Sequence, residues 1–389
     1  MNKNNGTVAI LGSTGSVGTQ SVEVAKHLGL KVDLLLASSS VDKLEKQARE
    51  LNPRVCVMTD EKAADELKIK LSDTQVKVYS GEKSACSAIE ESDASTAVDA
   101  VGGFAGLAPA LACARSGKRI AMSNKEAIIV AYGILKKAID EGGAELVPVD
   151  SEHSAIFQCL DMRHKNPVKR IILTSSGGPF RGKSRELLKS ISAKDALAHP
   201  TWKMGAKITV DSASLMNKGF EVIEAVRLFG VKPEQIKVVV HPQSIMHSAV
   251  EYIDNSVIAQ MGAPDMRTCI QYALTYPERK ASLAKPLDFA SIGSITFEEP
   301  DTDTFTLLPL AYYAIGEDGV IPAVLNASDE VAVSCFLRGE IGFTDIFDIV
   351  ENTVKNFKNI KNPSLEEIIN ADKEARIIAA QAAEKIIKA

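Results

Sequence analysis

The sequence lacks paired cysteines. Its six cysteines contain no CxxC pair, and they are Cys56, Cys86, Cys113, Cys159, Cys269 and Cys335. Zinc clusters need such pairs, and disulfide frameworks belong to short secreted chains, so the pattern argues against both in a chain of 389 residues. We interpret the cysteines as reduced thiols of a cytosolic protein.

Long apolar runs, targeting segments and a strong net charge are missing as well. No apolar stretch approaches the roughly 18 residues that cross a bilayer, and the start, MNKNNGTVAILG, passes into a strand pattern without a signal or transit segment. A net charge of −5 gives no electrostatic reason to expect nucleic acid or a membrane as partner. We therefore expect a cytoplasmic protein of a bacterial cell.

The patterns that are present predict an α/β protein of several domains. Residues 1–150 alternate short apolar strands with helical patterns, which is typical of a Rossmann-like parallel sheet. Residues 151–280 carry the strand patterns KRIILTSSGG, KVVVHPQSIMHSAVEYI and SVIAQMG, interrupted by the loop ALAHPTWKMGAKIT, and predict a central α+β domain. Residues 281–301 are a predicted linker, and residues 302–389 a C-terminal helical domain in which Ser364 and Glu367 have capping-box spacing.

A glycine-rich turn follows the first predicted strand. Gly12, Gly15 and Gly18 let bare backbone approach a phosphate at a helix N-terminus, although a tight turn that binds nothing is the alternative. The next strand ends in Ser38, Ser39 and Ser40, where an NAD site usually places an acid. Without that acid a 2′-phosphate is not repelled, which favours NADPH, but serines are also ordinary turn residues.

Two carboxylates lie close together in PVDSEHSAIFQ. If this segment is extended, Asp150 and Glu152 point to the same side, and Glu221 offers a third carboxylate at the start of an amphipathic helix. Hard oxygen ligands suit Mg²⁺ or Mn²⁺ better than zinc, and a cation would offset the repulsion. The alternative is a set of solvated surface acids.

Further polar residues suit a phosphate monoester, although each one alone is more often a cap or a turn: Ser176, Ser212, Asn217 and Lys218. The segment HPTWKMGAK, with His199 and Trp202, has the composition of a lid, or else Trp202 is a core anchor. Asn124, Lys125 and Glu126 follow a predicted strand at the edge where open α/β sheets bind ligands.

Seven motifs occur in order along nearly the whole chain: LGSTGSVG, SNKEA, VDSEHSAIFQ, SSGGPFR, HPTWKMGAKITVDSASLMNKGFEVIEA, HPQSIMHS and LNASDEVAV. In these motifs the sequence resembles the 1-deoxy-D-xylulose 5-phosphate reductoisomerases. That family rearranges and reduces this sugar phosphate to 2-C-methyl-D-erythritol 4-phosphate in non-mevalonate isoprenoid biosynthesis. The resemblance implies NADPH, one Mg²⁺ or Mn²⁺ ion, a homodimer of V-shaped three-domain subunits, and a flap with Trp202 and Met204.

The resemblance also implies roles for individual residues. Implied cofactor contacts are Thr14, Gly15, Ser16, Val17, Ser38, Ser39, Ser40, Asn124, Glu126 and Gly205. Implied metal ligands are Asp150, Glu152 and Glu221, which count as catalytic together with Lys125 and His199. Implied substrate contacts are Lys125, Ser151, Glu152, Ser176, His199, Ser212, Asn217, Lys218 and Glu221.

Two details depart from the family pattern. Ser38 to Ser40 replace a run of glycine, a basic residue and asparagine, and Ser328 with Asp329 stand where alanine and asparagine are frequent. Two other functions keep the fold: a dinucleotide-sensing regulator, which gives no reason for the three acids, and another NADPH-dependent dehydrogenase, which usually needs an activated Cys, Lys or His.

Overall fold

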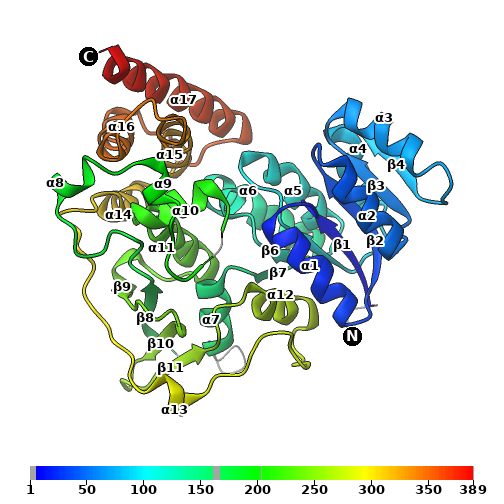
Figure 1. Cartoon of the computed structure of the whole chain (residues 1–389), viewed down its shortest axis with the longest axis horizontal. Coiled ribbons are helices and arrows are strands. Elements are labelled where there is room, and N and C mark those ends of the chain that lie inside the picture. Colours follow the sequence, from blue (N-terminus) through cyan, green and yellow to red (C-terminus); the bar gives the residue numbers. More distant parts are fainter. Residues whose placement is uncertain (1–5, 161–166, 203, 389) are drawn as a thin grey trace. The chain divides into compact units, whose positions relative to one another are not determined.

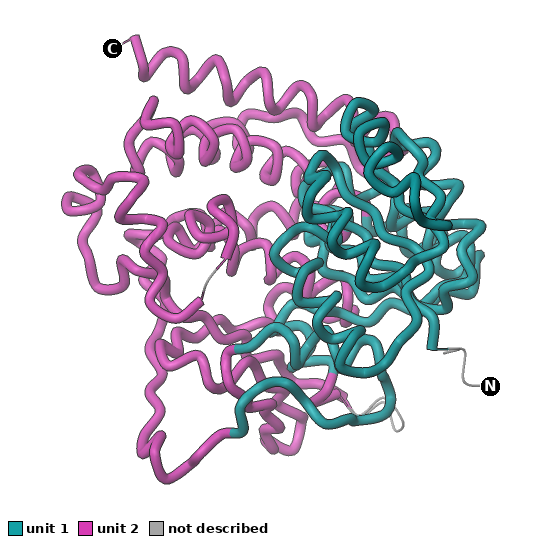
Figure 2. The backbone as a smooth tube through the Cα atoms, turned by 45° about the vertical axis from the view of Figure 1, so that its right-hand side comes forward, with its two compact units in different colours: residues 1–127, 132–157, 265–286 teal, residues 128–131, 158–264, 287–389 magenta. Residues whose placement is uncertain are grey.

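The computed structural model describes residues 6–160, 167–202 and 204–388 (Figure 1). Contacts divide the chain into two compact units, coloured in Figure 2. Unit 1 comprises residues 1–127, 132–157 and 265–286, and unit 2 comprises residues 128–131, 158–264 and 287–389. These units follow packing rather than chain order, so the predicted borders at residues 150, 280 and 301 stay a prediction.

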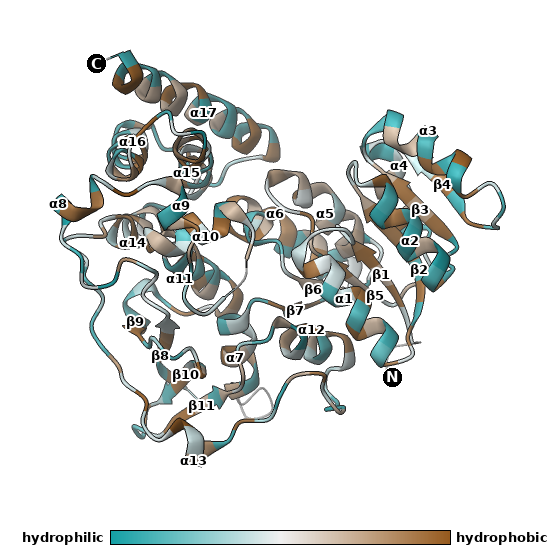
Figure 3. Cartoon of the chain, in the orientation of Figure 1, coloured by the Kyte–Doolittle hydropathy of each residue, from teal (hydrophilic) through white to brown (hydrophobic). Residues whose placement is uncertain are grey.

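The sheet of unit 1 consists of seven parallel strands, as the alternating pattern predicts. Their order is β4-β3-β2-β1-β5-β6-β7, with β1 Thr7–Leu11, β2 Lys31–Ala37, β3 Val55–Met58, β4 Lys77–Ser80, β5 Thr96–Asp99, β6 Arg119–Met122 and β7 Glu145–Pro148. Strands buried on both faces read as continuous apolar runs, and Figure 3 contrasts the hydrophobic β3 with the hydrophilic residues of α2.

Helices connect these strands. They are α1 Ser16–His27, α2 Val41–Leu51, α3 Glu61–Lys70, α4 Glu82–Glu90, η1 Phe104–Gly106, α5 Leu107–Arg115 and α6 Lys125–Gly142, and α12 Met266–Thr275 packs on α1. The strand order runs outward from β1 to β4 and then resumes at β5 on the other side of β1. Ligands of open α/β sheets bind at such a switch point, outside the carboxyl ends of the strands.

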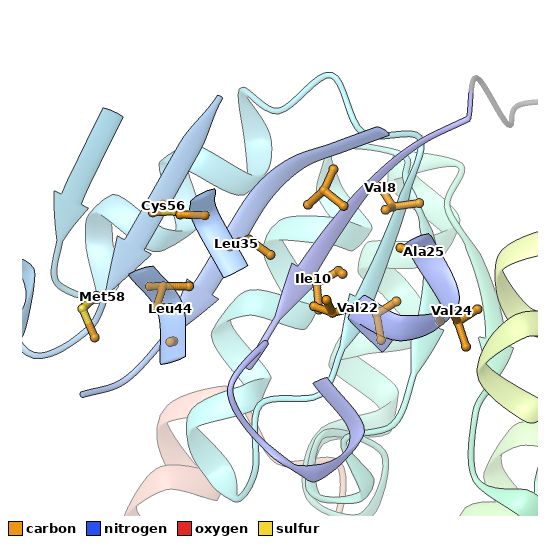
Figure 4. Close-up of a cluster of buried hydrophobic side chains, with 14 of the residues drawn as sticks. Val8, Ile10, Val22, Val24, Ala25, Leu35, Leu44, Cys56 and Met58 are labelled. Atoms are coloured by element: carbon orange, nitrogen blue, oxygen red, sulfur yellow. The ribbon is translucent and has the colours of Figure 1, made fainter. Parts of the chain in front are cut away.

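The apolar core of unit 1 fixes this end of the sheet. Figure 4 shows Val8 and Ile10 of β1 in one cluster with Val22 and Ala25 of α1. These side chains are almost completely buried, and α1 therefore begins at a fixed place directly after β1.

Unit 2 contains the predicted second sheet, which is mixed. Its order is β11-β10-β8-β9, with β8 Val168–Ser175, β9 Ile236–Val240, β10 Met246–Tyr252 and β11 Val257–Met261. Only β8 and β9 pair in parallel. Shorter elements surround it: α8 Arg185–Leu188, α9 Ala193–Ala196, α10 Ala206–Ala213, α11 Met216–Phe229, η2 Pro233–Gln235 and α13 Phe289–Ile292.

The C-terminal region is helical, as predicted. It consists of α14 Leu307–Glu317, α15 Ile321–Leu337, α16 Phe343–Asn356 and α17 Leu365–Lys388, and Figure 1 shows α15, α16 and α17 side by side. The predicted capping box is confirmed, because Ser364 N donates to Glu367 at 2.8 Å and Glu367 N donates to the Ser364 hydroxyl at 3.2 Å. Among the described residues, no helix combines the length and apolar character that a membrane span requires.

Candidate active site

A cavity of about 310 Å³ opens in unit 1 where β1, β2 and β5 end. Its lining consists of Gly12, Thr14, Gly15, Leu36, Ala37, Ser38, Thr59, Glu82, Ala85, Cys86, Ala100, Val101, Gly102, Ala105, Ala108 and Pro109. Three of the residues predicted to contact a cofactor, Thr14, Gly15 and Ser38, line it. The cavity therefore lies at the switch point, where the glycine-rich turn meets the serine run.

The glycine-rich turn cannot carry side chains at two positions. Gly12 has a φ of +77°, and a Cβ on it would lie 2.3 Å from the carbonyl oxygen of Ala100. A Cβ on Gly18 would lie 2.0 Å from the carbonyl oxygen of Gly12. The turn is held to β2, because the amides of Gly12 and Ser13 both donate to Leu36 O. Glycine is therefore required at these two positions for steric reasons. Because the turn has no side chains there, a phosphate could approach its backbone from the cavity.

Other predicted cofactor residues lie near the cavity without lining it. Ser16 and Val17 form the first turn of α1, and Ser39 and Ser40 are exposed ahead of α2. Glu126 lies in the first turn of α6, and its carboxylate accepts a hydrogen bond from the side-chain amide Nδ2 of Asn124.

Asn124 has a supporting role that its sequence motif does not reveal. As the N-cap of α6 it accepts a hydrogen bond from Ala127 N at 2.7 Å, while its amide nitrogen donates to the carbonyls of Val101 and Gly103 at 2.7 and 2.9 Å. Asn124 therefore fixes the loop after β5 that lines the cavity.

The loop after β5 was not among the residues predicted to line a site. Residues 100–105 supply four lining residues, and Thr59 and Glu82 line the cavity after β3 and β4. The glycine-containing run VGGFAG directly after an apolar strand could have indicated this loop. The carboxyl ends of neighbouring parallel strands meet at one edge of the sheet, so a loop that follows such a strand lies where ligands bind.

Asp99, at the end of β5, is a buried acid that no predicted role uses. Its Oδ2 has no hydrogen-bond partner among the described residues, and its Oδ1 accepts only a long bond from Val101 N at 3.4 Å. Burial raises the pKa of Asp99 to about 8, with a smaller contribution from Glu126, while the Val101 amide lowers it. The carboxyl group is consequently neutral below about pH 8 in the folded protein.

The substitution Asp99→Asn is expected to raise stability increasingly with pH. Because the folded pKa of about 8 lies above the ordinary value of 3.8, the wild-type protein loses stability as pH rises through this interval. In urea unfolding, the difference in unfolding free energy between variant and wild type should grow in favour of the variant by about 1.4 kcal/mol per pH unit between the two pKa values. A gap that is constant with pH would contradict this account.

The segment around Asp150 is a helix N-terminus, so the extended conformation considered for it is wrong. Helix α7 spans Ser151–Cys159, and Asp150 Oδ1 accepts hydrogen bonds from the amides of Glu152 and His153 at 3.1 and 3.2 Å. Pro148 ends β7, and an Asp two positions later suits an N-cap. Lys125 Nζ contacts Asp150 Oδ2 at 2.5 Å, and the Ser151 hydroxyl donates to Glu152 at 2.6 Å.

Glu221 is buried in the second turn of α11 rather than at its start. Its carboxylate accepts a hydrogen bond from Asn217 Nδ2 at 2.5 Å and contacts the ammonium group of Lys218. The three side chains lie on neighbouring turns of one helix, which brings an amide, a cation and a carboxylate together at one point.

Three carboxylates suit a cation. Asp150 and Glu152 belong to unit 1 and Glu221 belongs to unit 2, and together they are a set of acids that could hold a metal ion. Three hard oxygen donors without a thiolate or imidazole match Mg²⁺ or Mn²⁺ rather than zinc.

A second polar cluster joins the loop after β8 to α10. The Ser176 hydroxyl lies 3.1 Å from His199 Nε2 and accepts a hydrogen bond from Gly178 N at 3.3 Å. Gly178 has a φ of +68°, and a Cβ on it would lie 2.5 Å from the carbonyl oxygen of Ser212. The bare glycine thus lets the backbone of Ser212 approach the loop that carries Ser176.

His199 also holds the segment predicted as a flap. Its Nδ1 accepts hydrogen bonds from the amides of Thr201 and Trp202 at 3.2 and 2.9 Å, so the neutral ring carries its proton on Nε2 and donates to Ser176. Burial lowers the pKa of His199 and favours this neutral form. Trp202 is half-buried with its ring centroid 6.1 Å from that of His247, and Lys203 lies outside the described residues.

The last predicted cofactor contact, Gly205, is the N-cap of α10. A Cβ on Gly205 would meet no atom of the described residues within 4 Å. Packing within this part of the chain therefore does not require a glycine there.

Family models match three parts of the chain. Residues 8–132 match the model described as 1-deoxy-D-xylulose 5-phosphate reductoisomerase, residues 146–229 match its C-terminal domain, and residues 261–378 match the DXP reductoisomerase C-terminal domain.

Curated relatives and solved structures match nearly the full length. The 1-deoxy-D-xylulose 5-phosphate reductoisomerase of Caldanaerobacter subterraneus subsp. tengcongensis is 50% identical over 94% of this chain and 96% of its own, and that of Bacteroides fragilis is 47% identical over 96% of both. The enzyme from Zymomonas mobilis in complex with NADPH has a TM-score of 0.92 and 40% identity over 97% of this chain and 99% of its own. A DOX-P reductoisomerase in complex with NADPH, fosmidomycin and magnesium has a TM-score of 0.91 and 38% identity over 97% and 98%.

Proposed function

Because the chain belongs to the 1-deoxy-D-xylulose 5-phosphate reductoisomerase family, we propose that it converts 1-deoxy-D-xylulose 5-phosphate into 2-C-methyl-D-erythritol 4-phosphate, using NADPH and Mg²⁺ or Mn²⁺. The three carboxylates of Asp150, Glu152 and Glu221, with the family membership, carry this proposal. They distinguish a metal-dependent rearrangement from dinucleotide binding alone.

The three carboxylates would hold the divalent cation. When bound, the cation polarises the hydroxyketone oxygens and stabilises the negative charge that develops on them. Each of these carboxylates has a polar partner that orients it. Asp150 is in contact with Lys125, Glu152 accepts a hydrogen bond from Ser151, and Glu221 is in contact with Asn217 and Lys218.

The cluster around Ser176 would bind the substrate phosphate. The Ser176 oxygen accepts from His199 and Gly178, so its own hydrogen remains for a phosphate oxygen, and Ser212 lies beside Gly178. Asn217 and Lys218 add an amide and a cation. The His199 ring would couple a movement of residues 199–202 to the phosphate site, because its Nδ1 accepts from the amides of Thr201 and Trp202 and its Nε2 donates to Ser176.

The cavity in unit 1 would hold NADPH, which supplies the hydride for the reduction step. Gly12, Thr14 and Gly15 would surround its pyrophosphate at the N-terminus of α1, and Ser38 would lie near the 2′-phosphate. The neighbouring Glu82 is an acid in the same lining, which makes a direct comparison of NADPH with NADH informative.

The decisive experiment follows the loss of NADPH absorbance with 1-deoxy-D-xylulose 5-phosphate as substrate. Turnover should stop with EDTA and return with excess Mg²⁺ or Mn²⁺. A regulator would bind NADPH without turnover, and another dehydrogenase would oxidise NADPH with a different carbonyl substrate and without metal. Either result would overturn the proposal.

The substitution Lys218→Ala is expected to raise KM for the sugar phosphate by about 10- to 100-fold, because a buried charge-assisted contact to the phosphate is lost. KM for NADPH should stay unchanged. The exposed Lys232 is a matched control, and Lys232→Ala should leave both constants unchanged. An unchanged KM in Lys218→Ala would remove this residue from the phosphate site.

A homodimer in the cytoplasm is part of the proposal. Strand β11 lies at the edge of its sheet, and Val257 and Ile258 on it are 48% and 50% exposed, which suits pairing with a second copy. The six cysteines are all free thiols, as expected in a reducing compartment. Sedimentation equilibrium tests the dimer, and the mass of a single chain would contradict it.

A further inference from the structure

A buried charged cluster in unit 2 lies outside the groups described so far. Lys207 Nζ is 2.7 Å from Asp211 Oδ2 and 2.8 Å from Asp329 Oδ2. Both carboxyl groups are almost fully buried, at 2% and 0% exposure, whereas the Lys207 side chain is 33% exposed. The lysine ammonium also lies 4.6 Å from the ring centroid of Phe220.

The cluster connects three helices. Lys207 and Asp211 are one turn apart on α10, Phe220 lies on α11, and Asp329 lies on α15. The pair within α10 cannot orient that helix against its neighbours, whereas Asp329 forms an ion pair between α10 and α15. A buried ion pair is weak evidence for stability, because desolvation offsets the attraction, but it does fix the relative register of the groups it joins.

The charges of the cluster balance. Burial raises the pKa of Asp211 well above its ordinary range, and the neighbouring Asp329 raises it further. Burial also raises the pKa of Asp329, while Lys207 lowers it. Asp211 therefore keeps its proton, and one cation faces one anion in the protein interior.

The two ends of α10 differ in packing, because its N-terminal residues Gly205 and Ala206 are exposed and Ala213 at its other end is buried. It begins at Gly205, which has no neighbour where a Cβ would stand, directly after the segment held by His199. Near its other end, Ser212 follows Asp211 and lies against Gly178 of the phosphate cluster. A shift of α10 would therefore displace Ser212 from Gly178, whose amide donates to the Ser176 hydroxyl.

We infer that Asp329, through Lys207 and Asp211, is a positioning residue that holds α10 and thereby sets the place of Ser212 in the phosphate site. This inference rests on the proposed function, because it assigns a phosphate to Ser212. Asp329 does not touch the substrate in this account. Its effect is to keep the position of Ser212 within the few tenths of an ångström that phosphate binding tolerates.

The test compares Asp329→Leu with Asp329→Asn. Leucine removes the tie to α15, so KM for 1-deoxy-D-xylulose 5-phosphate should rise about 10-fold or more, with kcat and the Kd of NADPH changed less than about twofold. Asparagine can donate a hydrogen bond to Asp211, which then ionises opposite Lys207, so KM should return to within about twofold of wild type. If Asp329→Leu folds poorly, Lys207→Met with Asp329→Leu removes the cation and the anion together and should show the same rise.

Arg376→Met is the matched control. Arg376 on α17 pairs with Glu330, the neighbour of Asp329 on α15, with 2.6 Å between Arg376 Nη2 and Glu330 Oε2. Arg376→Met therefore also breaks an ion pair of α15, but this pair does not hold a helix of the phosphate site. It should lower the Tm and leave KM unchanged. Equal KM in wild type and Asp329→Leu, or an equal rise in Arg376→Met, would overturn the inference.

Calorimetric binding of the sugar phosphate separates this inference from the proposed function. If wild type binds the compound but does not turn it over, the proposed function fails, while weaker binding to Asp329→Leu would still support the positioning role. Equal binding to both would refute the positioning role.

Discussion

Replacing Glu221 by glutamine is expected to lower kcat by about 10³-fold while the Kd of NADPH stays unchanged. Glutamine keeps the shape and can still contact Asn217, but it removes one of three anionic oxygen donors. Losing several kcal/mol of charge stabilisation in the transition state corresponds to this factor. The cavity lining includes no residue of α11, so cofactor binding should persist.

Metal titrations distinguish this cause from a general loss of folding. The Mg²⁺ or Mn²⁺ concentration for half-maximal activity should rise in Glu221→Gln, and raising the metal should restore only part of kcat. The exposed Glu234 provides a control for the loss of one negative charge, and Glu234→Gln should behave as wild type. Weakened NADPH binding in Glu221→Gln would contradict the assignment of metal and cofactor to separate segments.

The local geometry at the candidate metal ligands differs from the sequence-based prediction. Asp150 and Glu152 are held by a helix N-terminus instead of an extended segment. The apolar run before Pro148 suggested that the strand continued, whereas the proline ends it and the following Asp caps a helix. An aspartate two positions after this proline is the signal in the sequence that indicates a helix start.

The units could not be predicted, because they depend on contacts between residues far apart in the chain. Arg119 Nη1 donates to the carbonyl of Tyr276 at 2.6 Å, and the ring of Phe157 lies 5.0 Å from that of Tyr276. Residues 265–286 consequently pack with unit 1, although the chain reaches them only after the second sheet. Local periodicity identifies α12 as a helix but carries no information about its partner.

The strands of unit 1 were predictable for the opposite reason. In a parallel sheet covered on both faces each strand is apolar along its length, so Thr7–Leu11 and Val55–Met58 are identified without any partner. The cavity follows from strand order as well as strand identity. The loop after β5 became recognisable as its wall only once β5 was known to pair with β1.

The substitution Gly12→Ala is expected to raise the Kd of NADPH by about 10-fold or more and to lower stability. The new Cβ would stand 2.3 Å from the Ala100 carbonyl oxygen, so either the turn or the loop after β5 must move, and both line the cavity. Adopting a positive φ costs an alanine about 1 kcal/mol more than a glycine. Fluorescence titration with NADPH and urea unfolding measure the two effects separately.

Gly29→Ala isolates the conformational cost from the steric one. Gly29 has a φ of +64°, but a Cβ there meets nothing within 4 Å, so this variant should lose about 1 kcal/mol of stability and bind NADPH as wild type does. Gly15→Ala should fall between them, because its φ is ordinary and its Cβ would lie 3.3 Å from Gly12 O. If Gly12→Ala bound NADPH as tightly as Gly29→Ala, the close approach of the turn to Ala100 would have no part in holding the cofactor, and the cavity would have to be assigned to another ligand.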